Sequence, residues 1–297
     1  MRDDSDFQQD FDSLVPPSND SDRVDRRGFM KLAIGTGFAA AVLPVSAQTV
    51  IRTDTVGLTA GEIMLTVNGQ QVPVYRAQPE GKTNLPVVLV VSEIFGVHEH
   101  IADVARRFAK LGYLALAPEL FVRQGDPSKY GTIAELQKEI ISKVPDAQVM
   151  TDLDACVAYA RANGGNTDRL AVTGFCWGGR ITWLYSAYNP NVKAAAAWYG
   201  RLVGEKTALT PQQPTDIAPT LKTAVLGLYG GKDDGIPVAT IEQMKTALAT
   251  GNSKSEFIVY SNSGHAFHAD YRPSYVVADA KDGFARTLAW FRSHGVV

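Results

Sequence analysis

The chain of 297 residues lacks several features that would assign it directly to a class of protein. Its formal net charge is only −2, and it has no segment rich in lysine and arginine and none that interleaves basic with aromatic residues. A nucleic acid is therefore not expected as a partner. Only two cysteines occur, Cys156 and Cys176, so the place of each in the fold needs a reason.

One apolar segment near the N-terminus, Leu32–Val45, is shorter than the about 20 residues that a membrane-spanning helix needs. It contains glycines and a proline, which makes a membrane anchor the weaker alternative. The segment follows the pair Arg26 and Arg27 and ends in the small-residue sequence Val45-Ser46-Ala47. This order resembles a twin-arginine export signal that is cleaved after Ala47.

The export signal divides the chain into two parts. Residues 1–47 are expected to be an N-terminal region that is removed, of which the acidic residues 1–25 are predicted to be disordered. Residues 48–297 are expected to form one domain in the periplasm or another extracytoplasmic compartment. No cysteine directly follows the cleavage site, so a lipid anchor is not expected there, and no stable membrane insertion is expected after cleavage. The twin-arginine export machinery is the macromolecular partner that this signal implies.

Hydrophobic periodicity predicts the fold of residues 48–297. The alternating segments "EIMLTV" and "VPVYRA" flank the turn Asn68-Gly69 and predict an antiparallel hairpin. Continuous apolar runs follow, "LPVVLVVS", "YLALAP", "RLAVTG", "VKAAAAWYG" and "TAVLGLYG", as is typical of parallel strands buried on both faces. Helices are predicted over residues 101–111, 146–162, 179–188, 238–250 and 278–291. The fold class is therefore α/β, a single three-layer domain with a mostly parallel central sheet and an N-terminal antiparallel hairpin.

Cys176 lies in the sequence "AVTGFCWGGR", between an apolar strand and a predicted helix. A sharp strand-to-helix turn needs small neighbours, which Gly174 and Gly178 supply, and it projects the residue at its centre. The helix dipole at such a position favours a thiolate. Cys176 is therefore a candidate nucleophile; the alternative is a small apolar core residue beside a glycine-rich loop.

Candidates for an acid and a base follow Cys176 in the order that this fold class uses, nucleophile, acid, histidine. Asp233 and Asp234 come after the strand "TAVLGLYG", and His265 comes after the strand "EFIVY". Ligands of α/β sheets bind at the carboxyl ends of the strands, where these residues are expected. Either aspartate can orient the imidazole of His265, and His268 is an alternative base.

A metal site is not expected. His98 and His100 resemble a metal-binding pair, but no third ligand stands at a suitable spacing. The sequence therefore predicts neither a metal nor an organic cofactor.

From about Glu62 to Val297 the sequence resembles the dienelactone hydrolase family of α/β-hydrolases. The resemblance rests on "SEIFGVHEHIADVARRFAKLGYLALAPELFVRQG", "GFCWGGR", "GGKDDGIP" and "GHAFH". It implies an α/β-hydrolase fold and cysteine-dependent hydrolysis of lactone or ester bonds through a thioester acyl-enzyme. The substrate that it implies is a small anionic lactone or ester.

The resemblance also implies roles for individual residues. Cys176 corresponds to the nucleophile and His265 to the base. The family's acid stands four residues before the proline that ends its turn, which selects Asp233 over Asp234. Glu93, in "SEIFG", matches a glutamate that lies beside the cysteine and helps it to ionise when substrate arrives; the alternative is a strand-end carboxylate facing water.

Two backbone amides are expected to form an oxyanion hole. One belongs to Trp177, directly after the nucleophile, and the other, by resemblance, to Ile94. The family holds a substrate carboxylate with two arginines, and Arg123 in "LFVRQG" matches the first. The second usually stands where this chain has Ala269, so the nearby Arg272 is a candidate substitute.

Two other functions stay open on the sequence alone. One is a general carboxylesterase or thioesterase, and the other is a non-hydrolytic exported thiol protein that uses Cys176 as a redox sensor. A sensor would need a resolving cysteine nearby. Cys156 is the only other cysteine, and its place on the predicted helix 146–162 is typical of a helix core.

Overall fold

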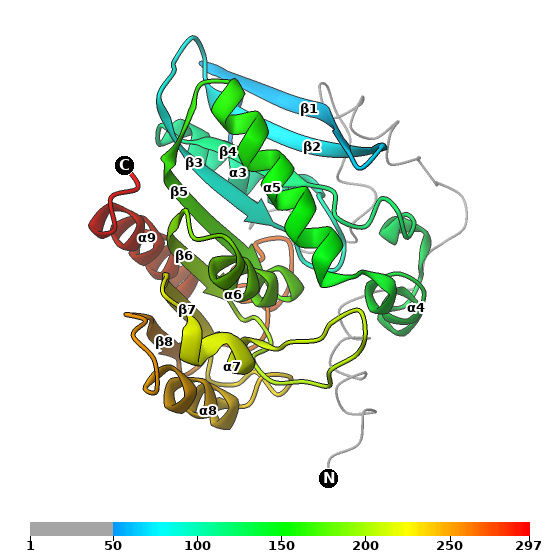
Figure 1. The fold of residues 1–297 in the computed structure, drawn as a ribbon, viewed down its shortest axis with the longest axis vertical. Coiled ribbons are helices and arrows are strands. Elements are labelled where there is room, and N and C mark those ends of the chain that lie inside the picture. Colours follow the sequence, from blue (N-terminus) through cyan, green and yellow to red (C-terminus); the bar gives the residue numbers. More distant parts are fainter. Residues whose placement is uncertain (1–49) are drawn as a thin grey trace.

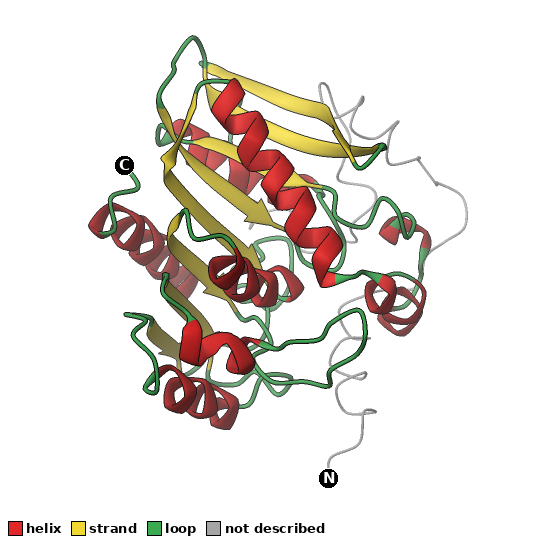
Figure 2. Cartoon of the chain, in the orientation of Figure 1, coloured by secondary structure: helices red, strands yellow, loops and turns green. Residues whose placement is uncertain are grey.

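The computed structural model describes residues 50–297, in which eight strands form one sheet in the order β1-β2-β4-β3-β5-β6-β7-β8. The sheet runs through the middle of the molecule, with helices on either side (Figure 2). The predicted export signal and the boundary at residue 47 lie outside the described residues. The strands are β1 (Leu58–Val67), β2 (Gln70–Pro79), β3 (Leu85–Val91), β4 (Leu114–Pro118), β5 (Gly165–Phe175), β6 (Val192–Trp198), β7 (Ala224–Gly230) and β8 (Glu256–Tyr260).

The predicted hairpin is formed by β1 and β2. Val67 pairs with Gln70 across a two-residue turn, in which Asn68 and Gly69 both have positive φ, 50° and 77°. β2 also pairs antiparallel with β4, whereas the strands from β4 through β3 to β8 are parallel. Every residue of β3 is buried, as its continuous apolar run predicts. The predicted fold class, an α/β domain with a mostly parallel sheet and an N-terminal hairpin, is confirmed.

Helices cover both faces of the sheet. α5 and α6 lie on one face and α3 and α9 on the other (Figure 1). α3, α5, α6, α8 and α9 correspond to the predicted helices, and α5 has the predicted bounds, whereas the short α4 and α7 have no counterpart in the prediction. The helices are α3 (Glu99–Lys110), α4 (Ile133–Glu139), α5 (Asp146–Ala162), α6 (Trp177–Tyr188), α7 (Pro214–Ile217), α8 (Val238–Leu248) and α9 (Val277–Ser293). Within residues 50–297, none of these helices combines the length and the apolar character needed to span a bilayer.

The register of the parallel strands brings four chain segments to one edge of the sheet. Val91 of β3 pairs with Gly174 of β5, and Gly230 of β7 pairs with Tyr260 of β8. These residues stand at or next to the carboxyl ends of their strands. The segments that follow the four strands therefore leave the sheet on the same side, which is where ligands of α/β sheets bind.

Candidate active site

Cys176 forms the turn between β5 and α6. It has φ 55° and ψ −116°, a conformation that a non-glycine residue adopts only under constraint. The constraint is visible in its backbone bonds. Its N–H donates to the carbonyl of Trp198 at 3.0 Å, and its carbonyl accepts from the N–H groups of Gly179 at 2.9 Å and Arg180 at 3.2 Å. The turn leaves the Cys176 side chain partly exposed.

The two predicted glycines are needed because backbone packs directly against backbone at this turn. A Cβ at Gly174 would lie 2.3 Å from the carbonyl oxygen of Gly178. A Cβ at Gly178 would lie 2.4 Å from the carbonyl oxygen of Val91. Both distances are far inside van der Waals contact, so any side chain at either position would push α6 away from the sheet.

His265 and Asp233 form a closely bonded pair. Nδ1 of His265 lies 2.7 Å from Oδ2 of Asp233. The other carboxylate oxygen of Asp233 accepts from the amides of Gly235 at 3.0 Å and Ile236 at 3.1 Å, which fixes the carboxylate in place. Asp234 is exposed, whereas Asp233 is buried. Of the two aspartates that the sequence offers, Asp233 is therefore the one in contact with the imidazole.

The imidazole of His265 lies between two acidic groups. Burial by itself would lower the pKa of His265, but the charges of Asp233 and Cys176 and their hydrogen bonds to the ring raise it to about 10. The ring of Tyr199 packs edge-on against it with the centroids 5.2 Å apart. The alternative base, His268, is packed in the core, with its ring centroid 4.9 Å from that of Phe175 and 4.6 Å from that of Trp198.

Glu93 lies directly beyond β3 and is 3% exposed, so it does not face water. Its Oε2 lies 3.1 Å from Nε2 of His98, and its Oε1 accepts from the hydroxyl of Tyr271 at 3.5 Å. Burial raises the pKa of Glu93, but His98, His100 and Arg272 together hold it below the ordinary value. Burial also lowers the pKa of His98, so the pair is a neutral imidazole that donates to a carboxylate.

His98 and Tyr271 as partners of Glu93 are not predicted by the sequence, in which His98 stands out only as half of a possible metal pair. The structure gives each histidine of that pair a carboxylate instead, since Nδ1 of His100 lies 3.1 Å from Asp270. Among residues 50–297, no group of histidine, cysteine, aspartate and glutamate side chains is arranged to hold a metal ion.

The two amides expected in the oxyanion hole leave neighbouring strands. Trp177 is the first residue of α6, where an N–H has no acceptor within the helix. Ile94 is buried and follows β3. Because Val91 pairs with Gly174, the two residues stand at matching positions beyond paired strands. Their backbones are therefore placed on the same side of the sheet as Cys176.

The two arginines have different surroundings. Arg123 forms a bidentate ion pair with Asp152 of α5, at 2.7 and 2.8 Å, so its guanidinium group already binds a carboxylate of the protein. The guanidinium of Arg272 lies over the rings of Phe95 and Tyr271, 4.8 and 5.2 Å from their centroids, and its Nε donates to the Tyr271 hydroxyl at 3.1 Å. Its two terminal nitrogens have no acceptor among residues 50–297.

Arg272 is electrostatically part of the site. Burial by itself lowers the pKa of Arg272, but the neighbouring Tyr271, Glu93 and Cys176 raise it above its ordinary value. The guanidinium is therefore charged next to both the candidate nucleophile and the buried carboxylate. Arg123 is expected from the sequence to hold a substrate carboxylate, but the structure gives it a different partner.

Cys156 lies on α5 and is fully buried. Burial raises the pKa of its thiol, and Asp152 raises it further. Both Cys156 and Cys176 are free thiols. A buried protonated thiol is inert, so Cys156 is poorly suited to resolve an oxidised Cys176.

The chain is similar to known proteins over most of its length. The sequence model of the Dienelactone hydrolase family matches residues 72–295. The "Putative carboxymethylenebutenolidase" of Methylorubrum extorquens is 56% identical over 291 residues, which cover 98% of this chain and 99% of that protein. A protein of the same name from Escherichia coli K12 is 52% identical over 261 residues, 88% of this chain and 96% of the other. The crystal structure of the "Putative Dienelactone Hydrolase" of Klebsiella pneumoniae matches with a TM-score of 0.78 and 56% identity, over 79% of this chain and 98% of that one.

Proposed function

The chain belongs to the dienelactone hydrolase family and is a hydrolase of carboxylic ester bonds, and we propose that it cleaves a lactone or ester through a thioester on Cys176. The observation that carries this proposal is the strained turn at Cys176 together with the bonded pair of His265 and Asp233. A nucleophile, a base and a group that orients the base are the three parts that such catalysis needs.

In the proposed reaction the Cys176 thiolate attacks the carbonyl carbon, and the amides of Ile94 and Trp177 bind the oxyanion. The tetrahedral intermediate collapses to a thioester, and the protonated His265 gives its proton to the departing alkoxide. Water, losing a proton to His265, then attacks the thioester and releases the acid and the thiolate. Asp233 binds Nδ1 of His265, which leaves Nε2 for these proton transfers.

Glu93 is proposed to respond to the charge of the substrate. In the structure it is a carboxylate near Arg272. A substrate carboxylate bound to Arg272 would bring a second negative charge to this place and would raise the pKa of Glu93. Glu93 then accepts the thiol proton of Cys176, so that an anionic substrate generates its own nucleophile, and Glu93 returns the proton to the thiolate when the anionic product leaves.

A panel of substrates tests the proposed function. Turnover should be measured for lactones that carry a carboxylate, for neutral lactones and for simple aryl esters. Preference for the charged lactones supports the proposal, and preference for neutral aryl esters supports the general esterase. Absence of turnover on every one of these substrates would contradict the proposed reaction.

We predict that Arg272→Ala lowers kcat/KM for a carboxylate-bearing lactone by about ten- to a hundredfold. A charge-assisted hydrogen bond is worth roughly 1.5 to 3 kcal/mol, which corresponds to this range. A neutral ester makes no such bond and should be hydrolysed at nearly the normal rate. Steady-state kinetics on the two substrates measure the selectivity directly.

Arg123→Ala is the matched control for this experiment. It removes the partner of the buried Asp152 and so loosens the attachment of its loop to α5, which should lower turnover of charged and neutral substrates alike. Selective loss of the charged substrate in Arg123→Ala, and not in Arg272→Ala, would reverse the roles proposed for the two arginines.

The N-terminal region is proposed to direct export by the twin-arginine route, followed by cleavage after Ala47. The paired change Arg26→Lys with Arg27→Lys is expected to retain the protein in the cytoplasm, because a receptor reads the two arginines and not the hydrophobicity of the segment. Cell fractionation and N-terminal sequencing of the recovered chain measure the outcome. Unchanged periplasmic recovery of a chain beginning near Gln48 would contradict the route.

A further inference from the structure

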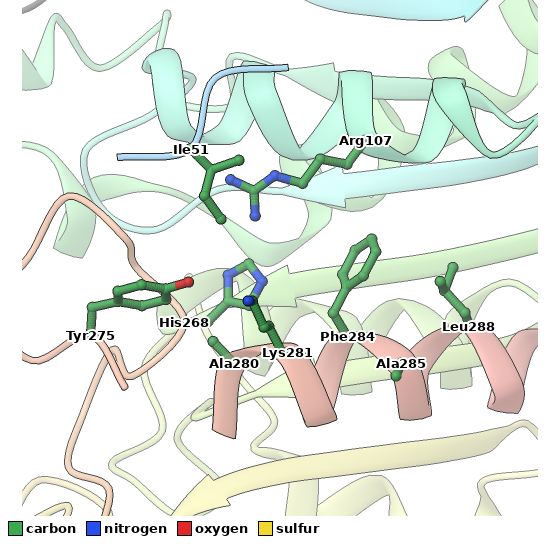
Figure 3. Close-up of a pocket in the computed structure, with 9 residues that line it drawn as sticks. All are labelled: Ile51, Arg107, His268, Tyr275, Ala280, Lys281, Phe284, Ala285 and Leu288. Atoms are coloured by element: carbon green, nitrogen blue, oxygen red, sulfur yellow. The ribbon is translucent and has the colours of Figure 1, made fainter. Parts of the chain in front are cut away.

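A pocket of about 260 Å³ lies between α3 and α9, on the face of the sheet that these two helices cover. Arg107 of α3, the α9 residues Phe284 and Leu288, and Ile51 line it (Figure 3). We call it the α3–α9 pocket. Since a single water needs only about 10 to 15 Å³ of such volume, the pocket has room for a small organic molecule and not only for a single bridging water.

The pocket is polar at one end and apolar at the other. Figure 3 shows His268, Tyr275 and Lys281 toward one end, and the side chains of Phe284 and Leu288 farther along α9. A ligand that matches this division carries a polar group at one end of an apolar body.

His268 supplies the first polar group. It is 2% exposed, and its ring points into the space between Arg107 and α9 (Figure 3). Its Nδ1 is buried and has no hydrogen-bond partner among the described residues. Burial, with the nearby charges of His100 and Arg107, holds the pKa of His268 well below its ordinary value, so the ring is a neutral donor and acceptor. A buried polar atom without a partner is costly, and a polar group of a ligand would supply the partner.

Lys281 supplies the charge. Its side chain forms no ion pair with any of residues 50–297, whereas Arg107 is already bound to Asp103 and Asp270. Of the two basic side chains that line the pocket, the exposed Lys281 is therefore the one whose charge is not already paired. An anionic head group complements it, and a carboxylate can also accept a hydrogen bond from the ring of His268.

From these observations we propose that the α3–α9 pocket is a second binding site, which takes a small carboxylic acid with an apolar body. The carboxylate lies between Lys281 and His268, and the apolar body lies along Phe284 and Leu288. The site is distinct from the active site, because none of Cys176, His265 and Arg272 lines the pocket. Yet His268 and Tyr275 belong to the same loop as His265 and Arg272, so an acid bound here would contact the loop that carries the catalytic base.

Calorimetric titration of the full-length protein with octanoate tests the site, with octanol as the uncharged counterpart. Ala285→Trp fills the pocket from the exposed face of α9 and should weaken octanoate binding by about tenfold or more. Ala289→Trp is the matched control, since Ala289 is exposed on the same helix and does not line the pocket. Lys281→Gln should weaken octanoate binding about two- to fivefold, the range of an exposed ion pair, and leave octanol unchanged.

Arg272→Ala separates this site from the active site. Octanoate binding that survives in Arg272→Ala and is lost in Ala285→Trp supports the proposal, whether or not the protein hydrolyses lactones. Binding that is lost in Arg272→Ala and survives in Ala285→Trp would place octanoate in the active site and overturn it. Absence of measurable binding to the unmodified protein at millimolar octanoate would also overturn it.

Discussion

Replacing Cys176 by alanine is expected to abolish ester hydrolysis while leaving the fold intact. The substitution removes the thiol that we propose as nucleophile, and loss of a nucleophile from a catalytic triad lowers kcat on the order of 10⁴-fold or more. The side chain is partly exposed at the turn, so its loss leaves no cavity in the core. Turnover of the best substrate in the panel measures the loss, and circular dichroism with urea unfolding measures the fold.

Cys176→Ser and Cys156→Ala complete this test. Serine should retain little activity, because its hydroxyl ionises much less readily than a thiol in a site arranged for a thiolate. Cys156→Ala should keep normal turnover, since Cys156 is buried on α5, and it shows the effect of removing a thiol that takes no part in the reaction. Near-normal hydrolysis by Cys176→Ala would refute the covalent mechanism.

The second large effect is expected from Asp233→Asn. The carboxylate holds Nδ1 of His265 at 2.7 Å and favours the tautomer that leaves Nε2 for proton transfer. An amide at this place can donate its own hydrogen to Nδ1 and so select the wrong tautomer, which in a serine-histidine-aspartate triad costs on the order of 10⁴-fold in kcat. Substrate binding should change far less, so kcat and not KM should carry the loss.

Asp234→Asn is the matched control, because Asp234 is the exposed neighbour of Asp233. It should leave kcat unchanged. A loss in Asp234→Asn equal to that in Asp233→Asn would mean that the turn, and not the carboxylate on His265, matters for activity.

The pH dependence of stability gives a second readout for Asp233→Asn. The pKa of His265 is raised from 6.5 to about 10 in the folded protein. Its stabilising contribution is therefore complete below about pH 6.5 and is lost as the pH rises toward 10. Removing the Asp233 charge should flatten this dependence, which urea unfolding at pH 6, 8 and 10 would show.

The elements and residues that the sequence predicts are those that depend on local pattern. Continuous apolar runs mark the parallel strands because both faces of such strands are buried. α5 has the predicted bounds, with Pro145 directly before its first residue and Asn163 directly after its last. α6 begins at Trp177, two residues before the prediction. The glycines at 178 and 179 lower helix propensity, and the close packing at this turn decides the boundary instead.

The contacts that the sequence does not predict join residues far apart in the chain or unrelated by any repeating spacing. Arg123 forms an ion pair with Asp152 of α5, and no spacing or motif in the sequence links these two residues. Glu93 contacts His98 because the loop after β3 folds back on itself. Tyr271, which also contacts Glu93, is 178 residues away in the sequence. Such pairings depend on how loops close over the sheet, and loop closure leaves no periodic signal in the sequence.

The packing of Gly174 against Gly178 has a consequence for how new substrate preferences can arise. Because main-chain atoms set the height of Cys176 above the sheet, no exchange of neighbouring side chains can shift the nucleophile by a small step. Laboratory selection for new substrates should therefore leave residues 174–178 unchanged. We expect the accumulated substitutions in the segments after β3 and β8 that carry Ile94 and Arg272, residues 94–98 and 266–276.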